Sequence, residues 1–240
     1  MRAIPYWPLA SPIRSTKGLL SELFLAVGVQ KKVEGIHFTA IGFVDTFDEL
    51  AEGIASLVKY TKTLQVINSF RHVNIGEEHQ ILFVLDALKR NSSVKEFTMY
   101  VEYVTPEIAA SLSELFEMNN TLTSVDICGL DCEIGSSEVE TILRGLRTNY
   151  TLTELQLSDQ LDEPEELKEM AEILARNVCL KNHAAEFGIS GARSSNEEAM
   201  NRLTKLYSSA AVVERAQQLT EQTAQAVLEE MWSIIERLNS

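Results

Sequence analysis

Residues 146–157, LRTNYTLTELQL, contain a pattern that recurs along the chain. Leu152, Leu155 and Leu157 follow a segment with helical spacing, and five other stretches align with this one. The aligned stretches are KKVEGIHF, TKTLQVINS, NSSVKEFTM, NNTLTSVDI, NYTLTELQL and NVCLKNHAA, anchored at Val33, Leu64, Val94, Leu122, Leu152 and Leu180. The anchors lie 31, 30, 28, 30 and 28 residues apart, so the sequence predicts about six repeats.

Each anchor is preceded by the pattern of a helix and followed by the pattern of a strand. The positions six and ten residues before the anchors are all apolar, and this four-residue step places them on one helical face. After the anchors, apolar residues alternate with polar ones, as at Phe97 and Met99. In four units an Asn lies three residues before the anchor, where it can close a helix in the left-handed conformation and bond nearby backbone groups. These residues are Asn91, Asn119, Asn149 and Asn177.

Repeats of one helix and one strand cannot close a core alone and must stack on their neighbours. We therefore expect an α/β fold, a right-handed leucine-rich repeat solenoid of the ribonuclease-inhibitor-like class. Its parallel strands would form a concave sheet and its helices the convex side. The expected domains are the solenoid at 1–208, with about six helix–strand units, and a C-terminal helix at 209–240. The sixth unit departs from the pattern, with His183 and Ala185 at the strand positions.

The C-terminal segment 211–238 contains no Gly or Pro and is rich in helix-forming residues, so we expect one long helix there. Two roles are open for this helix. In the first, the helix caps the last repeat, since the ends of solenoids need a covering element. Alternatively, the end that contains Met231, Trp232 and Ile235 docks a partner or a second copy of the chain, because exposed patches rich in Trp and Met are enriched at interfaces.

The repeat unit resembles that of the leucine-rich repeat domain of tropomodulins and leiomodins. In this resemblance a helix is followed by Asn, two residues, Leu, two residues, an apolar residue, one further residue and a second apolar residue. The most specific part is the end, where LRTNYTLTELQLSDQ (146–160) precedes EMAEILARNVCL (169–180), FGISGAR (187–193) and NEEAMNRL (196–203). The resemblance covers roughly residues 30–205. It implies a cytoplasmic, cytoskeletal interaction module that is not an enzyme and that binds actin at the pointed end of the filament.

Composition and motifs exclude several other classes of function. The chain has 21 Lys and Arg against 35 Asp and Glu, a net charge of -14, which argues against binding nucleic acid because such binding relies on neutralised phosphates. No stretch approaches the roughly 18 consecutive apolar residues of a membrane span. The three cysteines have no zinc-ligand spacing, and GxSxG, P-loop and HExxH motifs are absent. We expect no metal, no cofactor and no catalytic residues.

The side chains that alternate with the buried strand residues are expected on the concave wall. Equivalent residues of neighbouring strands lie about 4.8 Å apart, so Phe70 and Tyr100 would be adjacent in one column, near acidic side chains. Such a surface suits a basic partner surface. The candidate partner-binding residues are Phe70, Glu96, Thr98, Tyr100, Asp126, Glu154, Gln156, Met231 and Trp232. Phe70 is either part of this surface or covered by the loop at 71–76, and both alternatives stay open.

A second function fits the same fold. The chain could be an adaptor or a substrate-receptor repeat domain, such as a secreted microbial effector that binds a host protein, because function depends on sites and not on the fold. Both hypotheses make another protein the partner, with actin as the candidate in the first. The oligomeric state stays open.

Overall fold

The computed structural model describes residues 26, 33–38, 47–69, 78–99, 101, 103–127, 132–157, 164–190, 210–220 and 222–239. The chain divides into two compact units, Met1–Ala171 and Glu172–Ser240. The long helix α6 (Pro164–Ser190) begins in the first unit and continues into the second. The described part of the first unit is an α/β structure, and that of the second unit is helical.

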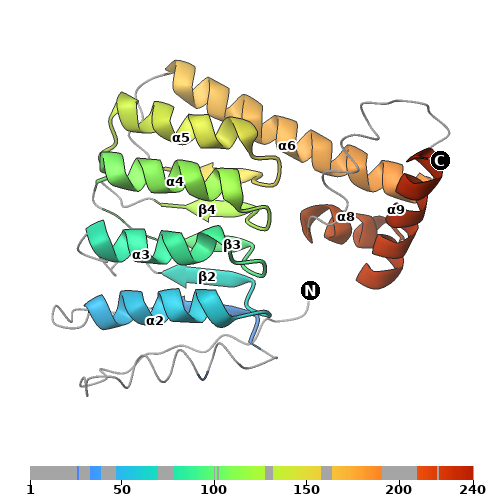
Figure 1. Ribbon diagram of the computed structural model, residues 1–240. Coiled ribbons are helices and arrows are strands. Elements are labelled where there is room, and N and C mark those ends of the chain that lie inside the picture. The colour runs from blue at the N-terminus through green and yellow to red at the C-terminus, as the bar shows by residue number, and fades with distance from the viewer. Residues whose placement is uncertain are drawn as a thin grey trace. The chain divides into compact units, whose positions relative to one another are not determined.

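Helices and strands alternate along the first unit (Figure 1). The strands are β1 (Gly35–Phe38), β2 (Val66–Ser69), β3 (Glu96–Thr98), β4 (Ser124–Asp126) and β5 (Glu154–Gln156). The helices between them are α2 (Phe47–Tyr60), α3 (Glu78–Lys89), α4 (Pro106–Met118) and α5 (Ser136–Thr148). The strands form one parallel sheet in the order β1-β2-β3-β4-β5, which confirms the predicted sheet of helix–strand repeats.

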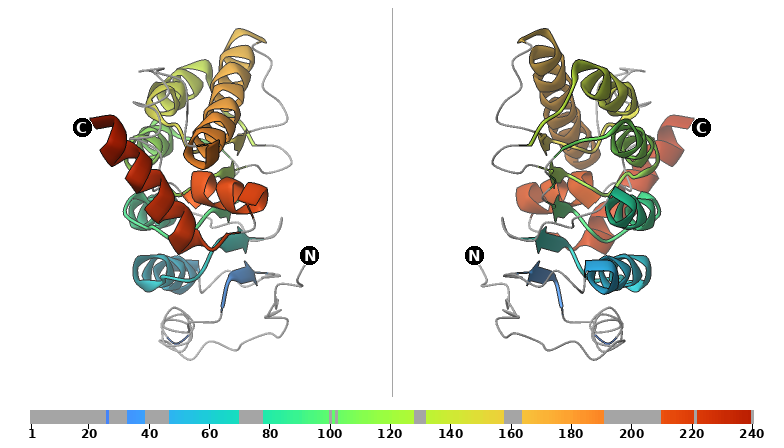
Figure 2. Two further views of the ribbon diagram at one scale, coloured as in Figure 1. Left: turned by 90° about the vertical axis from the view of Figure 1, so that its right-hand side faces the viewer. Right: turned by 90° about the vertical axis from the view of Figure 1, so that its left-hand side faces the viewer.

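The core of the first unit lies between this sheet and helices α2–α5, which form a layer on one of its faces (Figure 2). The register places the same repeat position side by side on each strand, so that Phe97 is paired with Val125 and Val125 with Leu155. All three side chains are buried, as are the anchors Leu122 and Leu152. Burial of these aliphatic and aromatic groups is the main favourable contribution to folding.

The helix ends follow the sequence in part. The hydroxyl of Thr105 accepts a hydrogen bond from the backbone N–H of Ile108 at 3.2 Å, and Pro106 opens α4, as is typical of a capped helix start. The left-handed conformation predicted for Asn119 and Asn149 is wrong, because their φ angles are -90° and -80° and both residues are extended. An extended residue turns the chain directly from the helix into the following strand.

These asparagines instead join successive repeats through their side chains. The amide Nδ2 of Asn119 donates to the main-chain oxygens of Leu88 and Asn91, at 2.7 and 3.0 Å. Its Oδ1 accepts hydrogen bonds from the backbone N–H groups of Thr121 and Leu122, both at 2.8 Å. Each such residue satisfies buried backbone groups of its own turn and of the preceding turn.

The prediction of a sixth turn and strand around Leu180 is wrong, because helix α6 runs without a break through Asn177 to Ser190. Leu180 and Ala184 lie four residues apart, so they share one face of that helix, and both are buried in a helical core. The same residues that resemble a strand anchor therefore serve as core residues of a helix.

The second unit has its own hydrophobic core, formed by α6, α8 (Ala210–Thr220) and α9 (Ala224–Asn239). A single helix over 211–238 is therefore a wrong prediction. Thr223 begins a new helix, because its hydroxyl accepts from the N–H of Ala226 at 3.3 Å and its carbonyl accepts from that of Val227 at 3.1 Å. Since α6 contributes to this core, the structure divides the chain at 171/172 and not at the expected 208/209. The core residues are Leu180, Ala184, Ala185, Val212, Val213, Ala216, Val227, Met231, Ile234 and Ile235.

Candidate functional site

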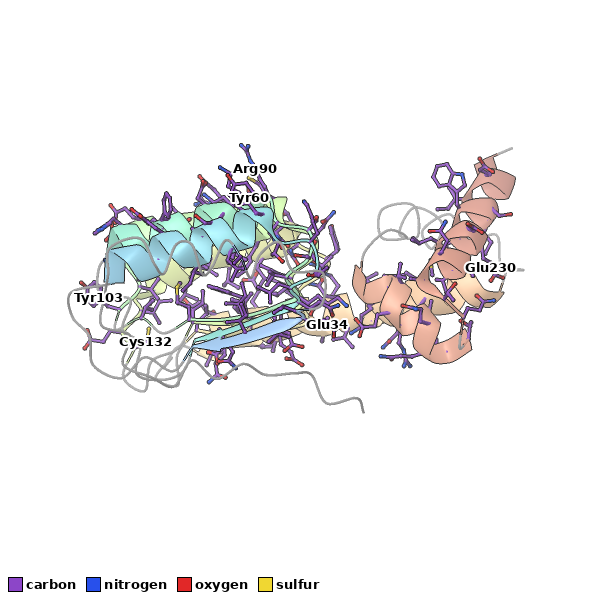
Figure 3. The ribbon with its side chains drawn as sticks, turned by 90° about the horizontal axis from the view of Figure 1, so that it is seen from below. Glu34, Tyr60, Arg90, Tyr103, Cys132 and Glu230 are labelled. Atoms are coloured by element: carbon purple, nitrogen blue, oxygen red, sulfur yellow. The ribbon has the colours of Figure 1, made fainter. Side chains whose placement is uncertain are left out.

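The sheet has a second face, opposite to helices α2–α5, on which the described side chains are exposed or half-buried (Figure 3). We call this surface the open sheet face. It consists of Val66, Asn68, Glu96, Thr98, Ser124, Asp126, Glu154 and Gln156. Alternation along each strand explains it, because the residues between these positions point into the core.

The strand register arranges the open sheet face into two rows. Glu96 is paired with Ser124, which is paired with Glu154, and the second row runs from Thr98 through Asp126 to Gln156. Neighbours in a row are about 4.8 Å apart, so each row presents a continuous line of polar groups. In the β2–β5 part of these rows there are three carboxylates and no Lys or Arg. The face can therefore offer hydrogen bonds and negative charge to a partner.

The structure brings five of the nine predicted partner-binding residues together on this face. They are Glu96, Thr98, Asp126, Glu154 and Gln156. Phe70 and Tyr100 lie outside the described residues, so neither alternative for Phe70 is resolved.

The other two predicted residues, Met231 and Trp232, lie on α9 in the second unit. The expectation that Met231 and Ile235 are exposed is wrong, because their side chains are 0% and 3% exposed in the helical core. Trp232 is 47% exposed. Successive residues point about 100° apart around a helix, so the buried face of α9 leaves Trp232 outside it.

Sequence reasoning missed a second group of exposed side chains, at the turns where helices α2 and α3 end. Tyr60 is 52% exposed, and Lys59, Lys62 and Arg90 at the same helix ends are exposed too. A usable signal was present, because these residues occupy the helix-end positions of two consecutive repeats. Those positions have no apolar periodicity, so a pattern of core residues does not identify them.

Ion pairs connect the helices of later repeats. The ammonium of Lys89 lies 2.8 Å from the carboxylate of Glu114. The guanidinium of Arg147 bonds Glu169 at 2.6 Å and Glu140 at 2.8 Å. Hydrogen bonds to Glu169, then to Glu140, raise the pKa of Arg147, and the bond from Arg147 lowers the pKa of Glu169. The pairs Lys89–Glu114 and Arg147–Glu169 join neighbouring helices, whereas Glu140 and Arg147 both lie on α5.

The described residues show neither a metal centre nor a membrane helix. No group of three His, Cys, Asp or Glu side chains in this part of the chain is arranged as metal ligands would be. Among the helices that the structure describes, none has both the length and the apolar character that a membrane span needs.

No protein-family model matches the chain. Tropomodulin-4 of Bos taurus is 27% identical over 123 residues, and Tropomodulin-4 of Homo sapiens is 28% identical over the same length. The chain is similar to the tropomodulins. In both cases the match covers 50% of this chain but 35% of the relative, so the chain spans about a third of the length of the curated relatives it matches.

A solved structure extends the comparison to the fold. "Leiomodin-1 Actin-Binding Site 2 (ABS2)" matches with a TM-score of 0.56 and 14% sequence identity, over 67% of this chain and 88% of that chain. At this identity the likeness concerns the fold alone. The predicted closeness to the leucine-rich repeat domain of tropomodulins and leiomodins is confirmed.

Proposed function

We propose that this chain is a non-enzymatic protein-interaction domain that binds actin. The observation that carries the proposal is the sequence similarity to Tropomodulin-4, which extends over half of the chain. The name of the leiomodin structure supports it, since that domain is an actin-binding site of its own protein and shares the fold of this chain.

The proposal also covers the shape of the repeats, the place where the domain acts and its effect on filament growth. The repeats form a right-handed solenoid whose concave wall is the open sheet face. The domain works in the cytoplasm, at the pointed end of the actin filament. A domain bound there would occupy the surface to which the next actin subunit adds, so elongation at that end would slow.

The open sheet face is the surface that we assign to this binding. Glu96 and Glu154 are exposed, and Asp126 lies between their strands, so basic side chains of a partner can pair with several carboxylates at once. Thr98 and Gln156 add hydrogen-bonding groups in the second row. Because the strands are fixed by the sheet, these groups are in place before binding and little ordering is required. Charge complementarity of this kind mainly raises the association rate and the specificity.

The second hypothesis, an adaptor or effector domain that recognises a different protein, has no observation among the described residues in its favour. Actin is therefore the first partner to test.

The test measures binding of labelled actin and elongation of filaments at pointed ends, with barbed ends blocked. The unaltered chain should bind actin and slow elongation. The double variant Glu96→Lys with Glu154→Lys should weaken both effects about tenfold or more, because it reverses the charge of the first row. The matched control is Glu52→Lys with Glu117→Lys, which changes the net charge equally at exposed helix positions.

The two measurements separate the parts of the proposal. Binding without slowed elongation would remove the pointed-end assignment and keep actin binding. Equal losses in the two double variants would remove the open sheet face as the binding surface. No binding at tens of micromolar actin would contradict the proposed function.

A further inference from the structure

The ends of helices α2 and α3 carry exposed positive and aromatic side chains, which we call the helix-end patch. It consists of Lys59, Tyr60, Lys62 and Arg90, all of them exposed. Figure 3 shows Tyr60 and Arg90 on the helix side of the molecule, away from the open sheet face. The patch is therefore a separate surface, and its role does not depend on the proposed function.

Hydrogen bonds hold the two turns of the patch beside each other. The side-chain amide of Asn91 donates to the main-chain oxygen of Val58 at 2.6 Å. The hydroxyl of Ser93 donates to the main-chain oxygen of Thr61 at 3.4 Å. The turns are also fixed internally, because Thr61 accepts from the N–H of Leu64 at 3.1 Å and Asn91 accepts from the N–H of Val94 at 2.7 Å. The exposed side chains thus project from backbone that is already ordered, which lowers the entropic cost of binding.

The positive charges of the patch are not neutralised within the described structure. Lys89 and Arg147 occupy the same repeat position as Lys59, and both bond a carboxylate of the next helix. The ammonium of Lys59 instead lies 5.6 Å from the centre of the Tyr60 ring. Neither Lys62 nor Arg90 forms an ion pair with any described residue. Three exposed cations and one exposed ring therefore lie at the ends of two neighbouring helices, in a chain whose net charge is -14.

We propose that the helix-end patch binds a short acidic peptide segment of another protein, with an apolar side chain of that segment packed on Tyr60. Carboxylates of the segment would pair with Lys62 and Arg90, and Lys59 would support the ring from its own side. An extended polyanion or a charged membrane suits the patch less well, because either one would extend beyond the patch and be repelled by a chain whose net charge is -14. A short segment limits the contact to the patch.

The test uses a short fluorescein-labelled peptide of alternating Glu and Leu residues and measures fluorescence anisotropy with the full chain. The peptide should bind, and its Kd should rise as the salt concentration increases from about 0.05 M to about 0.3 M. The double variant Lys62→Glu with Arg90→Glu should raise the Kd about tenfold or more. Tyr60→Ala should raise it about threefold, since the apolar contact and the neighbour of Lys59 are lost.

The matched control is Arg144→Glu with Lys168→Glu, which reverses two exposed charges on α5 and α6 and should leave the Kd unchanged. Circular dichroism of each variant checks that it is folded. A peptide that does not bind, or that binds the patch variant and the wild type equally, would overturn the proposal. So would tighter binding of phosphatidylserine vesicles or single-stranded DNA to the same patch. Loss of peptide binding in Glu96→Lys with Glu154→Lys would move the site to the open sheet face.

Discussion

The side-chain amide of Asn149 donates a hydrogen bond to the main-chain oxygen of Asn119, 3.2 Å away. In the same way, the side-chain amide of Asn119 donates to the main-chain oxygen of Asn91 at 3.0 Å. The three side chains form a buried row that passes from each repeat to the next. Thr61 takes this position one repeat earlier and, like the asparagines, accepts from the backbone of its own turn. The row thus combines local turn formation with stacking of the repeats.

Removal of one member of this row should be costly. Asn119→Ala leaves two buried carbonyls and two buried N–H groups without their side-chain partner, so we expect the free energy of unfolding to fall by about 3 kcal/mol. Asn119→Thr should cost less, because its hydroxyl can still accept within the turn, as Thr61 does. Urea denaturation measures both. The control Asn120→Ala, at an exposed neighbour, should change stability by less than about 0.5 kcal/mol.

Equal costs for the Ala and Thr substitutions would show that the bonds to the preceding turn dominate. A loss as small as that of the control would contradict the stabilising role of the row.

Helices α4 and α5 approach closely at Gly145. A Cβ atom at this position would overlap the main-chain oxygen of Ser113 and come within 2.7 Å of its Cα. Gly to Ala in a helix normally stabilises by about 1 kcal/mol, but here α5 would have to move away from α4. We therefore expect Gly145→Ala to lower the free energy of unfolding by about 2 kcal/mol. Urea denaturation measures the change in the free energy of unfolding, with Arg144→Ala as the control. An increase in stability in Gly145→Ala would contradict the close approach of α4 and α5.

The repeats could be predicted because their signal is local. Anchors such as Leu122 and Leu152 recur at a nearly constant interval, and the flanking periodicities of helix and strand agree with each other. The second unit could not be predicted in this way. Leu180 satisfies the spacing of a strand anchor and also the four-residue spacing of a helix with Ala184. The choice depends on packing against α8 and α9, which no local pattern contains.

The open sheet face could also be predicted, since Glu96 and Gln156 follow from alternation along strands whose register the repeat interval sets. Met231 and Trp232 were not distinguishable, because both are large and apolar and only the placement of the core decides which is buried. Apolar periodicity does not predict the helix-end patch, because its two turns are held together by hydrogen bonds between neighbouring repeats, such as that from Asn91 to Val58.

The pair of Arg147 and Glu169 should make stability depend on pH. The pKa of Glu169 is lower in the folded chain, so the folded state binds fewer protons there, and the stabilisation is present above the ordinary Glu pKa of about 4.3. It is lost as the pH falls through the lowered value. Both side chains are partly exposed, so Glu169→Gln should cost no more than about 1 kcal/mol at pH 7. Urea midpoints of both proteins should converge as the pH falls below about 4.3.

Salt gives an independent check on this pair. In about 1 M NaCl the difference between the wild type and Glu169→Gln should shrink at pH 7, because screening weakens exposed ion pairs. A difference that does not change with salt or acid would mean that Glu169 acts through packing.

Neighbouring residues Met231 and Trp232 should respond very differently to truncation. Met231→Ala removes a fully buried side chain from the helical core, so we expect a loss of about 3 kcal/mol. Trp232→Ala removes a half-exposed ring and should cost less than about 1 kcal/mol. Hydrogen exchange of the amides in α8 and α9 measures the effect where it arises, because these helices share the core with Met231. Faster exchange in the Met231 variant and nearly unchanged exchange in the Trp232 variant are expected, and the opposite order would mean that α9 is rotated about its axis.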